Sequence, residues 1–144
     1  MSQKPGRGDA LWAWKSFLRG HHPILMDFGL IGGASPPDAA FEPARYATGD
    51  TRRFAERMNL IAMEPRDDLS STGYTLASPG EEYLVLQPGD KGGPFTVMLE
   101  PGNYSAEWFS IASRETVPGE QTTVQGATGT GFSAPPGSSG LVVL

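Results

Sequence analysis

Three short apolar segments separated by turn residues constrain the fold of this chain more than any other feature. Residues 83–86 form a continuous run of strand-forming side chains, and residues 95–100 and 104–108 alternate between apolar and polar. The intervening residues 87–94 and 101–103 are rich in glycine and proline, which set the backbone angles of tight turns. Segments at roughly ten-residue spacing with such turns between them are typical of antiparallel strands. We therefore expect an antiparallel meander within a β-sandwich.

The strand-rich pattern continues to the end of the sequence. The chain has 19 glycines and 13 prolines among 144 residues, and because they are scattered between apolar runs they indicate turns rather than disorder. Residues 122–125 and 141–144 are predicted to be further strands. Residues 126–140 between them are rich in glycine and serine, which predicts a loop with Phe132 as its anchor.

The first part of the chain contains a strong helix signal. Asp9 is a good helix N-cap and Gly20 a good residue to follow a helix end, so residues 10–19 are predicted to be helical. Trp14 lies on the apolar stripe of this helix and Trp12 lies off it. So large an apolar load on a short helix requires a substantial surface to pack against.

Two further elements are predicted after this helix. Residues 24–26 form a continuous apolar run, which is typical of a strand buried on both faces of a parallel sheet. Gly49 is expected to interrupt helical structure, and Asp50 is expected to cap a new helix over residues 51–61, with an apolar stripe that ends at Ile61.

These segments together predict an α+β chain with two parts. Residues 1–62 form an αβα unit, residues 63–73 form a polar connector, and residues 74–144 form the antiparallel β-sandwich. The shared alternation of the strands places Val97 and Trp108 in the core of the sandwich.

Composition excludes several classes of function. A formal charge of −5 and an isoelectric point near 4.9 argue against nucleic-acid binding, which calls for a basic face. Apolar runs stay well short of the roughly 18 residues of a membrane span. The absence of cysteine excludes disulfides and cysteine-ligated metal but does not fix the compartment. Residues 1–8 are polar and show no signal peptide, so the localisation stays open.

Few residues have the types and spacing of a catalytic or metal site. His21 and His22 are adjacent, and the chain has no other histidine, so we expect no metal site and no cofactor. Residues 126–131 superficially resemble a phosphate loop but lack its lysine. Asp27 is the one catalytic candidate, because polar residues at the carboxyl end of a parallel strand line the active face of α/β folds. The alternative is that Asp27 only caps the following turn.

The sequence W-A-W-K-S-F-L-R-G-H-H-P-I-L-M-D of residues 12–27 resembles a recurring motif of a known family. The family is a bacterial glycoside-hydrolase-like (β/α)8 barrel in which W-K-S-F-L-R-G is followed by N-P-I-x-M-D, with His22 here in place of the asparagine. Residues 49–60 are similar to the final barrel helix of that family. Residue 83 onward is similar, more loosely, to an appended β-sandwich named for collagen binding.

This resemblance implies that residues 1–62 are a remnant of a (β/α)8 barrel. Residues 9–27 would be its seventh helix and eighth strand, and residues 50–61 its eighth helix. Barrels of this type hydrolyse glycosides with two carboxylates from strands four and seven, which would lie upstream of Met1. The chain is therefore expected to be a C-terminal piece, inactive alone, of a secreted or periplasmic polysaccharide-degrading enzyme.

Three functional hypotheses follow. In the first, the sandwich is an accessory module that binds polysaccharide or extracellular matrix, with Trp108 and Tyr104 as candidate binding residues. In the second, the chain is a small glycosidase that uses Asp27 and a second carboxylate such as Glu42. In the third, the sandwich binds no ligand and only stabilises the barrel. In each case the apolar surface of residues 1–62 must be covered by the sandwich, by a second copy of the chain, or by the rest of the barrel.

Overall fold

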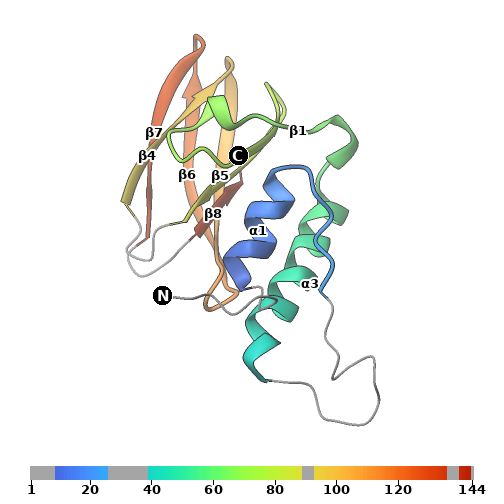
Figure 1. Ribbon diagram of the computed structural model, residues 1–144. Coiled ribbons are helices and arrows are strands. Elements are labelled where there is room, and N and C mark those ends of the chain that lie inside the picture. Colours follow the sequence, from blue (N-terminus) through green and yellow to red (C-terminus); the bar gives the residue numbers. More distant parts are fainter. Residues whose placement is uncertain (1–8, 26–38, 89–92, 136–139, 144) are drawn as a thin grey trace.

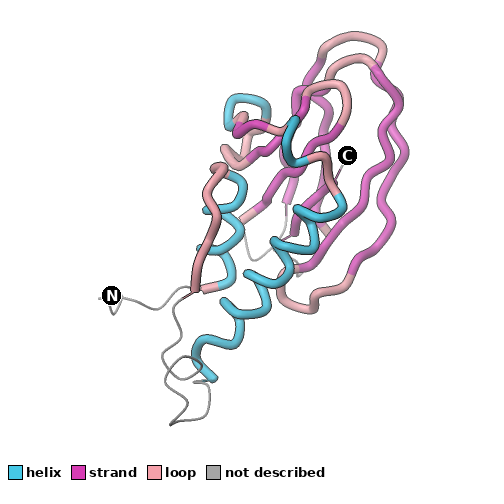
Figure 2. The backbone as a smooth tube through the Cα atoms, turned by 90° about the vertical axis from the view of Figure 1, so that its right-hand side faces the viewer, coloured by secondary structure: helices cyan, strands magenta, loops and turns pink. Residues whose placement is uncertain are grey.

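The computed structural model describes residues 9–25, 39–88, 93–135 and 140–143, and it has the α+β content that the sequence predicts. Helices gather on one side of the strands (Figures 1 and 2). The helices are α1 (Ala10–Leu18) and α3 (Glu42–Arg57), with short 3-10 turns η1 (Ala39–Phe41), η2 (Leu60–Ala62) and η3 (Asp67–Leu69). The strands are β1 (Glu64–Pro65), β2 (Thr75–Ser78), β3 (Glu82–Gln87), β4 (Gly93–Leu99), β5 (Gly102–Ser110), β6 (Thr116–Val124), β7 (Thr128–Ala134) and β8 (Gly140–Val143).

The strands form two antiparallel sheets with non-sequential neighbours. The large sheet has the order β1-β2-β3-β8-β5-β6, and the small sheet pairs β4 with β7. The predicted strands at residues 83–86, 95–100 and 104–108 are confirmed as β3, β4 and β5. The expected meander is wrong, because β4 belongs to the small sheet and β8 separates β3 from β5.

The predicted loop over residues 126–140 is also wrong for its first half. Residues Thr128–Ala134 form β7 and pair with β4 along its whole length. Phe132 and Ala134 are buried while their neighbours are exposed, so the strand does alternate. Three glycines between residues 126 and 131 hide this alternation in the sequence, because they supply no side chain on either face.

An inner apolar core draws on both sheets. Val97 is fully buried and Trp108 is 8% exposed, which confirms the predicted core positions. The large sheet contributes residues from β2, β3, β5 and β6, and the small sheet contributes residues from β4 and β7. Members include Ala77, Tyr83, Val85, Phe95, Val97, Leu99, Tyr104, Ala106, Trp108, Val124, Phe132 and Ala134.

The first helix forms as its sequence predicts. The Asp9 carboxylate accepts a hydrogen bond of 2.7 Å from the backbone N–H of Trp12, which satisfies a free donor at the helix N-terminus. Gly20 follows the helix with φ +77°, a conformation that favours glycine. Trp14 is fully buried and Trp12 is 39% exposed, as their places on the helix require.

A second apolar core joins the helices to the opposite face of the large sheet. Trp14 and Phe54 from α1 and α3 pack with Phe109 of β5, and Leu84 and Leu86 of β3 belong to the same cluster. Strand β3 is therefore buried on both faces, which is why residues 83–86 are continuously apolar. The apolar side chains of α1 and α3 are therefore covered by the large sheet of the same chain, which corresponds to the first of the three alternatives given for residues 1–62.

The second long helix differs from its prediction. It runs without interruption from Glu42 to Arg57, so Gly49 does not break it and Asp50 lies within it rather than capping it. A glycine in a helix interior costs only about 1 kcal/mol, which tertiary packing readily outweighs. Ile61 falls beyond the helix end and is fully exposed, so the expected stripe ends earlier, at Met58.

The prediction of a buried strand at residues 24–26 is wrong for residues 24 and 25, which are the part of it that the structure describes. Residues 21–25 form no regular secondary structure, and Ile24 is 75% exposed. Met26 and Asp27 lie outside the described residues. A parallel strand needs strand neighbours, and the sheets here are completed by the C-terminal half of the chain instead. Within the described ranges, no helix is long and apolar enough to cross a membrane.

Asp50 anchors the turn between β5 and β6 to helix α3. Its carboxylate is 1% exposed and accepts two hydrogen bonds of 2.9 Å from Arg114, and a further one from Arg53. Arg114 has φ +59°, an uncommon angle for a residue other than glycine, and its guanidinium lies 4.5 Å from the centre of the Tyr46 ring. The buried ion pair holds this turn in place.

Replacing Asp50 with alanine should lower the free energy of unfolding by about 2–3 kcal/mol, because two arginines lose their common acceptor. Both guanidiniums keep access to water, which limits the cost. Glu56→Ala on the same helix is the matched control, since Glu56 forms an exposed pair with Arg52 and should cost less than about 0.5 kcal/mol. Equal midpoints for the two variants in urea unfolding would contradict the anchoring role.

Candidate binding site

A pocket of about 350 Å³ opens where β4 and β7 of the small sheet face β5 and β6 of the large sheet. In Figure 1 the labels of these four strands lie to the left of helices α1 and α3. The size lies at the lower end of the range for ligand pockets, about 300–1,000 Å³. Its lining residues are Pro94, Ala106, Trp108, Glu120, Gly131, Phe132 and Ser133.

Aromatic rings form the rigid part of this pocket, which we call the Trp108 pocket. Trp108 meets Phe95 edge-to-face with ring centres 6.0 Å apart, and Phe95 stacks on Phe132 at 6.0 Å. Such packing fixes the ring positions. Trp108 is more than nine-tenths buried, yet no hydrogen bond from its Nε1–H occurs within the described part of the chain. The indole therefore offers an unused donor at the wall of the pocket.

A β-bulge in β6 lies beside Glu120, the acidic residue of the pocket, which is on the same face of β6 as Val124 of the inner core. Ser105 pairs with Gln121 and Glu107 pairs with Pro118, so Ala106 alone faces two residues, 119 and 120. A Cβ at Gly119 would lie 2.9 Å from both Ala106 Cβ and Trp108 Nε1, so only glycine fits there. Glu120 follows directly and lines the same pocket.

Glu120 is the charged group of the pocket. Strands β4, β5, β6 and β7 contain no lysine or arginine. Glu107, the other acidic residue on these strands, binds Arg57 of helix α3. No ion pair involves Glu120 among the described residues. The carboxylate is thus available to a ligand.

Tyr104 lies elsewhere in the inner core. Its hydroxyl donates a 2.9 Å hydrogen bond to the backbone carbonyl of Glu100, and its ring meets that of Tyr83 at 5.7 Å. Burial, aided by Tyr83 and nearby acidic groups, raises the pKa of Tyr104 to about 12. The hydroxyl already has an internal partner, and Tyr104 is not part of the lining of the Trp108 pocket.

The stability of the protein should fall between about pH 10 and pH 12 because of Tyr104. Over this range the unfolded chain releases the phenolic proton while the folded protein still holds it, so alkali favours unfolding. Urea unfolding at a series of pH values should show a smaller alkaline decline in Tyr104→Phe than in the parent protein. Tyr46→Phe, at a half-exposed tyrosine, is the control, and an unchanged decline in Tyr104→Phe would refute the assignment.

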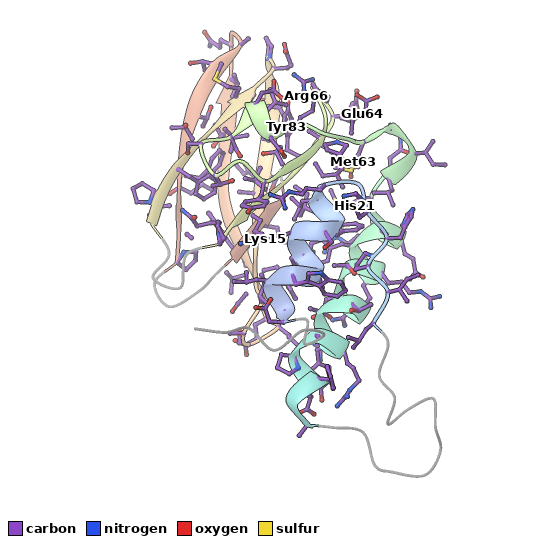
Figure 3. All side chains as sticks on the ribbon, viewed as in Figure 1. Lys15, His21, Met63, Glu64, Arg66 and Tyr83 are labelled. Carbon is purple, nitrogen blue, oxygen red and sulfur yellow. The ribbon has the colours of Figure 1, made fainter. Side chains whose placement is uncertain are left out.

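The described residues contain no catalytic carboxylate pair built on the sequence candidates. Asp27 lies outside them, and Glu42 is exposed at the start of α3, where it accepts a 3.0 Å hydrogen bond from Tyr46. Within the same residues no group of three or more histidine, aspartate or glutamate side chains could hold a metal ion. The exposed His21 lies near Met63 beyond the end of α1 (Figure 3), where both line a smaller pocket of about 170 Å³.

No protein-family model matches the chain, and no curated protein does. The site must therefore be interpreted from its own chemistry. Sequence reasoning named Trp108 but missed Glu120 and Ser133. The available signal was Pro118-Gly119, because two poor strand formers inside a strand mark a bulge.

Proposed function

We propose that residues 74–144 form a β-sandwich that binds carbohydrate in the Trp108 pocket. The observation that carries this proposal is a concave site with rigid aromatic walls and unpaired polar groups at its edge. Pockets for small ligands combine largely apolar walls with a few placed polar groups in this way.

The polar groups suit the hydroxyls of a sugar, which both donate and accept hydrogen bonds. Trp108 Nε1–H donates and the Glu120 carboxylate accepts. The apolar faces of a sugar ring pack against Pro94 and Phe132. A site of this kind orients one ring without any catalytic group.

We propose further that the chain is the C-terminal part of a polysaccharide-degrading enzyme. The support is the resemblance of residues 12–27 and 49–60 to the end of a glycoside-hydrolase-like barrel. On this proposal the chain alone has no glycosidase turnover, because the two carboxylates belong to earlier strands.

A stabilising role for the sandwich is the second candidate, and one observation favours it. The outer face of the large sheet packs against α1 and α3 through Leu84, Leu86 and Phe109. The Trp108 pocket lies on the other side of this sheet. The two roles use opposite faces and are compatible.

Binding should be tested by titrating the whole chain with a panel of neutral and charged oligosaccharides, followed by calorimetry. Glu120→Ala should weaken binding about tenfold, because the sugar hydroxyls lose the carboxylate that accepts their hydrogen bonds. Glu115→Ala is the matched control, since Glu115 is an exposed glutamate outside the lining and its variant should bind as the parent does. Melting curves verify that both variants are folded. Absence of binding to any oligosaccharide, or equal loss in both variants, would refute the proposal.

A further inference from the structure

The charged residues on the strands around the Trp108 pocket are mostly acidic. Residues 93–134, which span β4 to β7, contain four glutamates and a single arginine. That arginine, Arg114, is held by Asp50 at the far side of the large sheet. Among these glutamates, Glu120 is the one that lines the pocket. A bound ligand therefore meets a negative charge and no neighbouring positive charge from these strands.

The aromatic walls beside this carboxylate also favour a positively charged ligand. Aromatic rings attract cations through the negative potential of their faces, and Trp108 and Phe132 both line the pocket. An ammonium group would gain from the rings and from Glu120 together. An anionic sugar would meet repulsion from Glu120, and a neutral one would gain only hydrogen bonds.

We propose that the pocket selects sugars that carry a free ammonium group, with Glu120 as the residue that determines this specificity. The inference rests on the proposed carbohydrate binding and narrows its ligand to amino sugars. The ammonium lies against the Glu120 carboxylate, while Trp108 Nε1–H binds a ring hydroxyl. Uronic acid polymers and sulfated sugars are excluded as ligands.

The test compares three tetrasaccharides at pH 6 with the whole chain: a glucosamine tetramer, its N-acetylated form, and a uronic acid tetramer. The first two differ only in the charge and acetylation of the nitrogen. Since ion pairs open to solvent are worth at most about 1 kcal/mol, the glucosamine tetramer should bind about fivefold more tightly than the N-acetylated one. This preference should shrink at high salt, which screens the charge.

Glu120→Gln should abolish the preference, so that the glucosamine tetramer binds no more tightly than the N-acetylated one. Glu115→Gln is the matched control, because Glu115 is an exposed glutamate just before β6 that does not line the pocket, and it should keep the full preference. Equal affinity for the two glucosamine-based tetramers, or tight binding of the uronic acid tetramer, would overturn the amino-sugar specificity but leave carbohydrate binding standing. Failure to bind any of the three would overturn both.

Discussion

Replacing Trp14 with alanine should lower the free energy of unfolding by about 3–5 kcal/mol, the usual cost of truncating a large buried aromatic. Trp14 is fully buried. Its ring centre lies 6.2 Å from that of Phe17, 5.2 Å from that of Phe54 and 5.8 Å from that of Phe109. Since these rings come from α1, α3 and β5, the cavity would open where helices and sheet meet.

Trp12→Ala is the matched control for this prediction. Trp12 is on the same helix but 39% exposed, so its loss should cost less than about 1 kcal/mol. The loss of unfolding free energy for Trp14→Phe should fall between those of the two alanine variants. Trp14 Nε1 is buried and has no hydrogen-bond partner in the described part of the chain, and phenylalanine removes that unsatisfied donor. Urea unfolding monitored by circular dichroism gives the three values. Similar values for the alanine variants would show that the helix does not depend on this core.

A fragment of residues 1–62 should fail to fold cooperatively. Its helices bury their apolar side chains against Leu76, Leu84, Leu86 and Phe109, all of which lie beyond residue 62. Without them the fragment exposes half of its core, and domains of about 60 residues are marginal even when complete.

The fragment should show a weak helical signal, bind a hydrophobic dye and melt without a sharp transition, whereas the whole chain melts cooperatively. Circular dichroism and analytical ultracentrifugation together distinguish the outcomes. A sharp transition from a monomeric 1–62 fragment would show that α1 and α3 complete their own core, and would contradict the packing against the sheet.

Local signals in the sequence predicted single elements well. The Asp9 cap and Gly20 bracket α1 because both act through their immediate neighbours. The alternation of Phe95, Val97 and Leu99 predicted β4 and its buried face. Such features depend on few residues, all close in the chain.

Features that depend on distant pairing could not be predicted in this way. The order of strands follows from β8 joining β3 to β5 and from β7 joining β4, which no local pattern encodes. Glu120 enters the candidate site only because β6 pairs with β5, which brings it close to Ala106 and Trp108. The burial of Asp50 inside α3 likewise depends on Arg114, 64 residues away.

The central place of strand β8 has a consequence for how the protein is made. Translation delivers β1 to β3 and β5 to β6 before Gly140–Val143, so the large sheet first exists as two halves whose inner edges lack partners. Unpaired strand edges are templates for association with other chains. In the folded sheet β8 joins the two halves, because it pairs with β3 on one side and with β5 on the other. Loss of this one short strand would divide the sheet, so a product that stops before residue 140 is left open at its centre and exposed to proteases.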